Sequence, residues 1–468
     1  METLGAQLRQ AGLDEPVLAE LFGAAWTSED VPLVLDRYRA DDPRAALVRL
    51  FVLGEAVPAS SLPVPVEPLV TTGLAEVAEG LATARIRLAC FSGLLVAHDP
   101  PSTDADVVTG VNAASRTLAT LTVRRPVERA LDLGTGSGVE ALLASRHAAH
   151  VVATDVNPRA LRLAELSAQL SGASLDLREG SLFEPVEGER FDLIVANPPF
   201  VISPDTALVF RDSGLPDDEI CREVVRGAAA HLQAGGFATV LCNWICREPS
   251  ERWEPLLPWV DGLPCDVLLV AHGVIDPFRY ASRWNESHRN DPQAYAAAVS
   301  RWLDYYEREG VVGIGIGAVV LRGRGDGGPG RLHAFEAGAS AAGAAGQHIV
   351  RIFEAGDLLE RLADDAALLD QRLALVPGHR LQQTLVYGDE YGVAGVTMSL
   401  ADGIGLVAEI EPALVPLLFT LTPEQTVGSC AEEAGLDPAE VVPTVRLLLE
   451  RGLLRVGAAG IEPATSRV

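Results

Sequence analysis

The sequence predicts an α/β protein built on a mostly parallel sheet with helices on both faces. Over the middle of the chain, strand-like segments alternate with amphipathic helical patterns, as in repeated β-α-β units. The runs 193–196 and 267–270 are continuously apolar, as strands buried on both faces should be. A glycine-rich turn at 134–138 also joins the first of these strands to a helix.

The predicted elements follow one another in a regular order. The seven predicted strands are residues 129–133, 150–155, 175–178, 192–196, 236–242, 266–271 and 311–321. The predicted helices between them are residues 137–147, 158–170, 217–232 and 291–309. Asn157 suits an N-cap before Pro158, and Gly310 suits the end of the last helix.

The pattern divides the chain into four parts. We expect a mostly helical N-terminal domain at 1–95, with an apolar hairpin at 86–97, and then a cofactor-binding domain at 96–322. Residues 323–346 are rich in Gly and Ala and are predicted to be a linker or long loop. Residues 347–468 form an accessory domain whose end is winged-helix-like, although Pro443 inside its second helix is unfavourable there.

Composition excludes several classes of protein. The formal charge of −27 argues against a large basic surface for nucleic acid. The longest apolar run, 311–321, is too short to span a bilayer, and the first residues do not resemble a signal peptide. The six cysteines are scattered, with no C-x-x-C spacing, and the histidines show no metal-ligand spacing. We therefore expect a cytoplasmic protein without a metal site.

The glycine-rich turn is the first candidate for chemistry. Residues 131–138 read Leu-Asp-Leu-Gly-Thr-Gly-Ser-Gly, and glycines there let the backbone come close to a bound molecule. Such a turn could bind NAD, FAD or S-adenosylmethionine, or simply reverse the chain. Asp155 follows Gly134 by 21 residues, at the end of the second predicted strand. A carboxylate there suits the ribose hydroxyls of NAD or S-adenosylmethionine, or else a helix N-cap.

The decisive motif is Asn197-Pro198-Pro199-Phe200, directly after the fourth predicted strand. Two prolines force a rigid, extended exit from the strand. The Asn197 carboxamide and the next backbone carbonyl would then accept hydrogen bonds from a planar amide or amino group. These bonds would return electron density to its nitrogen, while Phe200 would stack on the planar face.

Together, Asp132–Gly138, Asp155 and Asn197–Phe200 resemble the class I S-adenosylmethionine-dependent methyltransferases. The resemblance is strongest to HemK-type release-factor glutamine methyltransferases and small-domain rRNA guanine-N2 methyltransferases, and it covers roughly residues 98–322. It implies a seven-stranded Rossmann-like sheet whose last strand is antiparallel. It also implies the S-adenosylmethionine contacts, which are Asp132, Gly134, Thr135, Gly136, Gly138, Asp155, Ser181, Leu182 and Asn197.

The resemblance assigns two further segments to the edge of the site. Ser181 stands where the family usually has an acid near adenine. Upstream, the segment 98–104 lies where the family closes over the cofactor. The candidate cofactor or substrate contacts at this edge are Thr103, Asp104, Arg211 and Asp212. Loop capping by the first two, or pairing of the last two with each other, is the alternative.

The implied reaction is in-line methyl transfer to nitrogen, without a metal or a strong general base. The substrate is a protein glutamine or a base of rRNA, tRNA or DNA, with a small-molecule amine as an alternative. A dehydrogenase would not explain Asn197–Phe200, and a non-enzymatic DNA-binding regulator would have no need to keep that motif. We expect the terminal domains to serve homodimer formation or protein docking.

Overall fold

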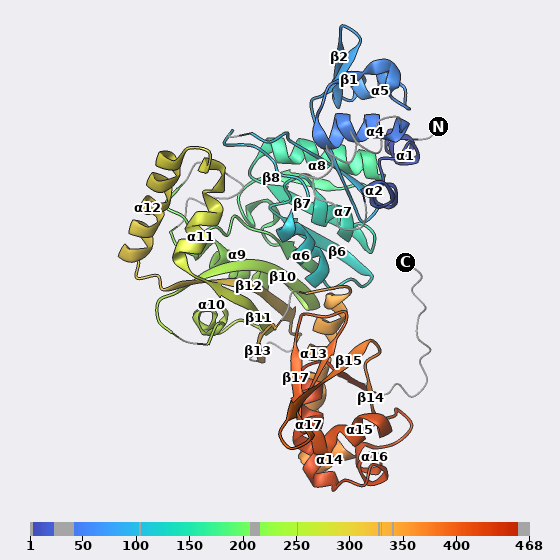
Figure 1. Ribbon diagram of the computed structural model, residues 1–468, viewed down its shortest axis with the longest axis vertical. Helices are drawn as coiled ribbons and strands as arrows, with labels where there is room; N and C mark the ends of the chain where they lie inside the picture. The colour runs from blue at the N-terminus through green and yellow to red at the C-terminus, as the bar shows by residue number, and fades with distance from the viewer. Residues whose placement is uncertain are drawn as a thin grey trace. The chain divides into compact units, whose positions relative to one another are not determined.

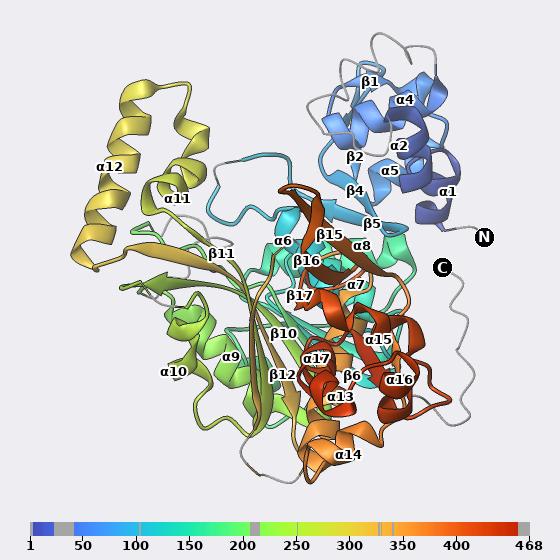
Figure 2. The same ribbon diagram turned by 60° about the horizontal axis from the view of Figure 1, so that its bottom comes forward.

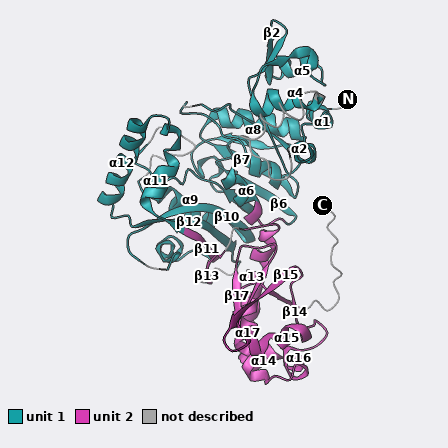
Figure 3. Cartoon of the chain, viewed as in Figure 1, with its two compact units in different colours: residues 1–119, 125–265, 274–328 teal, residues 120–124, 266–273, 329–468 magenta. Residues whose placement is uncertain are grey.

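The computed structural model describes residues 3–22, 42–102, 104–205, 216–249, 251–325, 328, 330–338 and 341–456. The chain forms two compact units (Figure 3). The first comprises residues 1–119, 125–265 and 274–328, and the second comprises residues 120–124, 266–273 and 329–468. The four-part division drawn from the sequence remains a prediction.

The N-terminal part of the first unit contains both helices and strands. Its elements are α1 (Leu4–Gln10), α2 (Glu15–Phe22), α4 (Pro43–Leu47), the π-helix η1 (Val48–Leu53), β1 (Val57–Pro58), η2 (Ala59–Ser61), α5 (Val66–Thr71), β2 (Ala75–Ala78), β3 (Leu81–Ala84), β4 (Arg87–Phe91), β5 (Leu94–His98) and α6 (Ala113–Leu121). The predicted hairpin forms as antiparallel β4 and β5. The sheet β1-β3-β2 was not predicted, because strands of two to four residues are too short to show alternation. Residues 33–38, whose apolar spacing also predicts a helix, lie outside the described residues.

An eight-stranded sheet dominates the middle of the chain. Its strands are β6 (Val127–Leu133), β7 (Ala148–Asp155), β8 (Asp176–Glu179), β9 (Phe191–Ala196), β10 (Leu232–Cys246), β11 (Cys265–Ile275), β12 (Gly313–Gly323) and β13 (Leu332–Glu336). Their order is β13-β11-β12-β10-β9-β6-β7-β8. Strands β6 to β10 pair in parallel where they are neighbours, whereas β12 runs antiparallel to β10. All seven predicted strands form, and the seventh is antiparallel as the resemblance implied.

The expectation of seven strands was nevertheless wrong by one. Strand β13 pairs in parallel with β11, inside the segment that was predicted to be a linker or loop. Its five residues are flanked by glycines and only partly buried, so no local pattern marks it as a strand. Pairing with the exposed edge of β11 supplies the hydrogen bonds that the sequence pattern does not reveal.

The four predicted helices form as α7, α8, α9 and α12, and further short helical elements occur between the strands (Figures 1 and 2). In chain order, all of these elements are α7 (Val139–Ala144), α8 (Pro158–Ser171), η3 (Glu184–Val186), α9 (Glu219–His231), η4 (Glu254–Leu256), α10 (Leu257–Val260), α11 (Pro277–Trp284), η5 (Glu286–His288) and α12 (Pro292–Arg308). The Asn157 side chain caps α8 by accepting from the Arg159 N–H at 2.9 Å. Cys242 and Cys246 lie on β10 as buried free thiols.

The N-terminal elements share a hydrophobic core with α8. Leu8 and Phe51 are fully buried in one cluster with Leu163 and Leu170 of α8. The Arg9 guanidinium also donates to the Leu170 carbonyl at 3.2 Å. The outer face of α8 is therefore covered by the N-terminal part of the chain, and the end of α8 nearest β7 faces the carboxyl edge of the sheet.

The second unit has its own core. After β13 its elements are α13 (Ala345–Arg361), α14 (Asp365–Leu369), β14 (Leu373–Leu375), β15 (His379–Tyr387), β16 (Tyr391–Leu400), β17 (Val407–Ile410), η6 (Pro412–Leu414), α15 (Val415–Thr420), α16 (Val427–Glu433), α17 (Pro438–Glu450) and β18 (Leu454–Val456). The two predicted helices form as α16 and α17, with Pro443 inside α17, and β18 pairs antiparallel with β14. No helix in the described ranges is long and apolar enough to cross a membrane.

Candidate active site

The register of the sheet brings the three sequence motifs together. Leu133 of β6 pairs with Thr154 of β7 on one side and with Ala196 of β9 on the other. The next residues along the three strands are Gly134, Asp155 and Asn197, so these leave the sheet side by side at its carboxyl edge. From β6 the chain adds β7 and β8 on one side of the sheet, whereas β9 and β10 lie on its other side. Open α/β sheets bind ligands outside the strand ends at such a switch point.

The glycine-rich turn leaves space beside its backbone. Gly134, Gly136 and Gly138 have φ of +72°, +55° and +87°, a region that favours glycine. A Cβ added at Gly134 or Gly136 would meet nothing within 4 Å, whereas one at Gly138 would lie 3.2 Å from Ala164 of α8. The first two glycines therefore keep the crevice open, and the third allows close packing on α8.

Asp132 holds the shape of this turn. Its Oδ2 accepts from the Thr135 hydroxyl at 2.6 Å and from the Ala141 N–H at 2.9 Å. The carboxyl group is buried, and the loss of hydration raises its pKa from 3.8 to about 6, with a smaller contribution from the charge of Asp155. Direct contact of Asp132 with a cofactor remains a prediction.

Asp155 connects the turn to the next strand end. Its Oδ2 accepts from the Gly136 N–H and its Oδ1 from the Asn157 N–H, both at 2.9 Å. Burial raises the pKa of this carboxyl group as well. The Asp155 carbonyl accepts from the Gly180 N–H at 3.1 Å, which brings Ser181 and Leu182 to the same edge. Ser181 is exposed and Leu182 is half-buried.

The Asn197 carboxamide is the least satisfied group of the site. Its Oδ1 is buried and has no hydrogen-bond partner among the described residues. A buried acceptor without a partner costs about 1–3 kcal/mol, so such an atom calls for a donor supplied by a ligand. Pro198 is buried, while Pro199 and Phe200 are half-buried, and Phe200 packs partly against a hydrophobic cluster.

Two contacts next to these strand ends were not expected from the sequence, one between Asp99 and Arg159 and one between Asn157 and Asp106. Asp99 is buried and pairs with Arg159 of α8 through two bonds of 2.6 Å, while its Oδ2 also accepts from the Val108 N–H at 2.9 Å. Asn157 donates from Nδ2 to the Asp106 carbonyl at 2.8 Å. These bonds hold Asp99, Asp106 and Val108 close to the ends of β7 and α8. Asp99 lies inside the segment predicted to close over the cofactor, but nothing in the sequence marked its partner.

Of the four candidate contacts at the edge of the site, the structure describes one. Asp104 is exposed, and its N–H donates to the Ser102 hydroxyl at 3.0 Å. Thr103, Arg211 and Asp212 lie outside the described residues. Their contact with cofactor or substrate remains a prediction.

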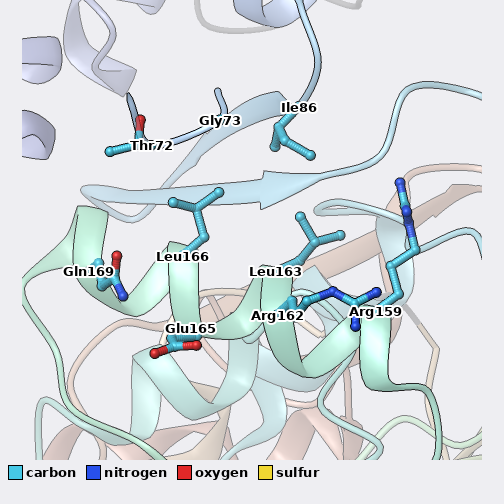
Figure 4. Close-up of a pocket in the computed structure, with 9 residues that line it drawn as sticks. All are labelled: Thr72, Gly73, Ile86, Arg159, Arg162, Leu163, Glu165, Leu166 and Gln169. Carbon is cyan, nitrogen blue, oxygen red and sulfur yellow. The ribbon is translucent and has the colours of Figure 1, made fainter. Parts of the chain in front are cut away.

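A separate pocket of about 380 Å³ lies along α8. Figure 4 shows Leu163, Leu166 and Ile86 pointing into this hollow, with Arg159 and Arg162 at its rim. None of its lining residues belongs to the three motifs, so this pocket does not coincide with the open space beside Gly134 and Gly136.

Comparison with known proteins matches the part of the chain that carries the motifs. The family described as "Methyltransferase small domain" matches residues 108–249. A release factor glutamine methyltransferase of Xylella fastidiosa (strain Temecula1) is 38% identical over 132 residues, which cover 25% of this chain and 47% of that protein. A ribosomal protein uL3 glutamine methyltransferase of Bradyrhizobium diazoefficiens is 37% identical over 157 residues, covering 29% and 47%.

The resemblance inferred from the motifs is confirmed by these matches. The chain spans about half the length of the curated relatives that it matches. Among solved structures, a T. Thermophilus 16S rRNA N2 G1207 methyltransferase in complex with AdoMet and guanosine is 23% identical, with a TM-score of 0.28, and covers 39% of this chain and 51% of its own.

Proposed function

We propose that the protein is an S-adenosylmethionine-dependent N-methyltransferase acting on a planar amide. The observation that carries this proposal is the buried Asn197 Oδ1, which has no partner in the described part of the chain. It lies at the end of β9, one strand away from the open glycine turn. An amide NH₂ is a donor group that fits an acceptor in that position.

The residues of the crevice fit S-adenosylmethionine. The open space beside Gly134 and Gly136 admits a ligand against the backbone, and Asp155 presents a carboxylate suited to ribose hydroxyls. When bound, S-adenosylmethionine supplies an activated methyl group on a sulfonium. Leu182 and Ser181, at the neighbouring strand end, would contribute to the adenine side of the site.

The Asn-Pro-Pro-Phe motif would orient the nucleophile. Asn197 Oδ1 and the Pro198 carbonyl accept hydrogen bonds from the two N–H groups, which fixes the nitrogen and raises its electron density. Correct orientation of reacting groups is worth up to roughly 7–11 kcal/mol of the barrier. The same acceptors stabilise the positive charge that develops on nitrogen. Phe200 would cover the planar face of the substrate.

A glutamine side chain of a protein is the substrate class that we favour. The matched relatives are named for glutamine methylation of release factors and of ribosomal protein uL3. The formal charge of −27 also disfavours an RNA or DNA substrate, because it repels phosphate groups at long range. A nucleobase and a small-molecule amine are the alternatives that the assay must separate.

The second unit is proposed to serve protein docking or homodimer formation in the cytoplasm. Its end combines α16, α17 and the antiparallel pair β14–β18, an arrangement consistent with a winged helix. Arg446 of α17 pairs with Asp365 of α14 at 2.7 Å, so the segment that would read DNA in a winged helix has this cation already engaged. The formal charge of −27 favours a role in contacts with protein over contacts with nucleic acid.

The proposal is tested first by calorimetric titration with S-adenosylmethionine and, separately, with NAD. Transfer of labelled methyl groups is then measured with release factors, ribosomal proteins, rRNA and small amines. Asn197→Ala should abolish transfer and leave the Kd for S-adenosylmethionine within about threefold. Unchanged turnover of Asn197→Ala would refute the role of the motif, and binding of NAD alone would refute the assignment of the cofactor.

A further inference from the structure

A pair of helices inserted between β11 and β12 packs against the exit of the Asn-Pro-Pro-Phe motif. Helices α11 and α12 lie side by side in residues 277–308 (Figures 1 and 2). They share a hydrophobic cluster with the residues that end and follow the motif. The main members of this shared cluster are Phe200, Val201, Ile202, Tyr280, Trp302 and Tyr306.

Ile202 is held at both of its backbone polar groups by this helical pair. Its N–H donates to the Tyr280 hydroxyl oxygen at 3.3 Å, and its carbonyl accepts from the Tyr306 hydroxyl at 2.8 Å. The Tyr280 oxygen also accepts from Asn243 Nδ2 of β10 at 2.7 Å. Ile202 and both tyrosines are buried, so water does not compete for these bonds.

The anchoring extends along the chain on both sides of residues 206–215. The Asp205 carboxylate accepts from Trp302 Nε1 at 2.9 Å and from Arg301 at 2.7 Å. Beyond that segment, the Asp217 carboxylate accepts from the Tyr305 hydroxyl at 2.8 Å. Helix α12 therefore ties down the chain where it leaves the motif and again where it approaches α9.

The motif depends on such anchors because of its two prolines. Pro198 and Pro199 have no N–H groups and cannot donate to a neighbouring strand. The sheet fixes the chain up to Ala196, which pairs with Leu133 and with Val240. After the prolines, the bonds at Ile202 set the path of the backbone, so they determine where the Asn197 carboxamide and the Pro198 carbonyl point.

We propose that Tyr280 and Tyr306 are positioning residues, which fix the exit of the Asn-Pro-Pro-Phe motif so that its two acceptors stay aimed at the substrate nitrogen. This inference rests on the proposed function. Neither tyrosine needs to touch the substrate, because each acts through the backbone of Ile202.

The test compares Tyr280→Phe and Tyr306→Phe with the matched control Tyr295→Phe in the full-length protein. Tyr295 packs against the same cluster, and its hydroxyl makes no hydrogen bond to the described residues. Methyl transfer should lose about tenfold in kcat in each of the first two variants, since small misplacements of reacting groups cost about one to two orders of magnitude. The Kd for S-adenosylmethionine should stay within twofold, and Tyr295→Phe should match the wild type.

Hydrogen exchange supplies a readout that does not depend on activity. In Tyr280→Phe the amide of Ile202 loses its acceptor, so the peptide covering 200–205 should exchange at least tenfold faster while β6 and β9 keep their protection. Unchanged exchange in this peptide, or unchanged kcat in both variants, would overturn the inference. Equal losses in Tyr295→Phe, or loss of S-adenosylmethionine binding together with kcat, would reduce the tyrosines to general stabilisers and overturn it as well.

If the proposed function is wrong, the same experiments would give a different combination of results. The wild-type protein would then transfer no methyl group to any amide, amine or base, while exchange at 200–205 would still respond to Tyr280→Phe. That combination would leave the anchoring intact and remove its link to methyl transfer.

Discussion

Asp132→Asn should remove a pH dependence from the stability of the first unit. Burial raises the pKa of this carboxyl group from 3.8 to about 6. The folded state therefore holds the proton more tightly than the unfolded state. The contribution of Asp132 to the free energy of unfolding is therefore most favourable below about pH 4, where the carboxyl group is protonated in both states. It declines as the pH rises toward 6 and stays at its lower value above that. At about 1.36 kcal/mol per pH unit, the decline amounts to about 3 kcal/mol.

Asparagine is suitable for this test because one carbonyl oxygen can still accept from Thr135 and Ala141. Urea unfolding should be followed between pH 4 and pH 7.5 in both proteins, on the transition that S-adenosylmethionine shifts. The two free energies of unfolding should be similar near pH 4, and Asp132→Asn should be more stable by up to about 3 kcal/mol at pH 7. Parallel curves over the whole range would refute the argument, whatever their offset.

Two other substitutions test the crevice and its closing segment. Gly134→Ala should cost about 1–2 kcal/mol because its φ is +72°, and its Cβ should weaken S-adenosylmethionine binding at least tenfold by entering the open space. Gly172→Ala is the control, because Gly172 has φ +73° and a Cβ there would also meet nothing within 4 Å. It should lose stability but keep the Kd for S-adenosylmethionine. Equal Kd values in the two variants would contradict the placement of the cofactor. Arg159→Met should lower the free energy of unfolding by about 3 kcal/mol because it leaves the buried Asp99 carboxylate unpaired. Adding Asp99→Asn should restore most of that stability, as measured by thermal unfolding. Additive losses in the double variant would contradict the pairing.

The geometry of the glycine-rich turn and of the strand end beside it, where we propose that the cofactor binds, could be predicted from the sequence because it depends on local backbone conformation. Three glycines at positive φ, a carboxylate at a strand end and an Asn-Pro N-cap each require particular residue types at particular positions. The sheet then brings the motifs together, since parallel strands end at a common edge. The seven strands expected from the sequence all form, and the last of them is antiparallel, whereas β13 depends on pairing with an edge that no local pattern reveals.

The path of the chain after the Asn-Pro-Pro-Phe motif depends on contacts between residues that are far apart in the sequence. Sequence patterns do not reveal such contacts. Tyr280 and Tyr306 lie 78 and 104 residues away from Ile202 along the chain, and each looks like an ordinary core aromatic on an amphipathic helix. The same holds for Asp99 and Arg159, which are 60 residues apart. Only the fold shows that these side chains act on the backbone around the motifs.

The motif and the helices that hold its exit belong to different parts of the chain. The segment that matches the methyltransferase family ends at residue 249, before α11 begins at Pro277. The motif itself therefore lies in the matched part, while the helices that hold its exit lie beyond it. Changes in α11 and α12 could move the two acceptors without altering any residue of the cofactor crevice. Substrate geometry and cofactor binding should thus be separable by mutation, with substitutions at Ile202 and its tyrosine partners changing kcat and those at Gly134 changing the Kd for S-adenosylmethionine.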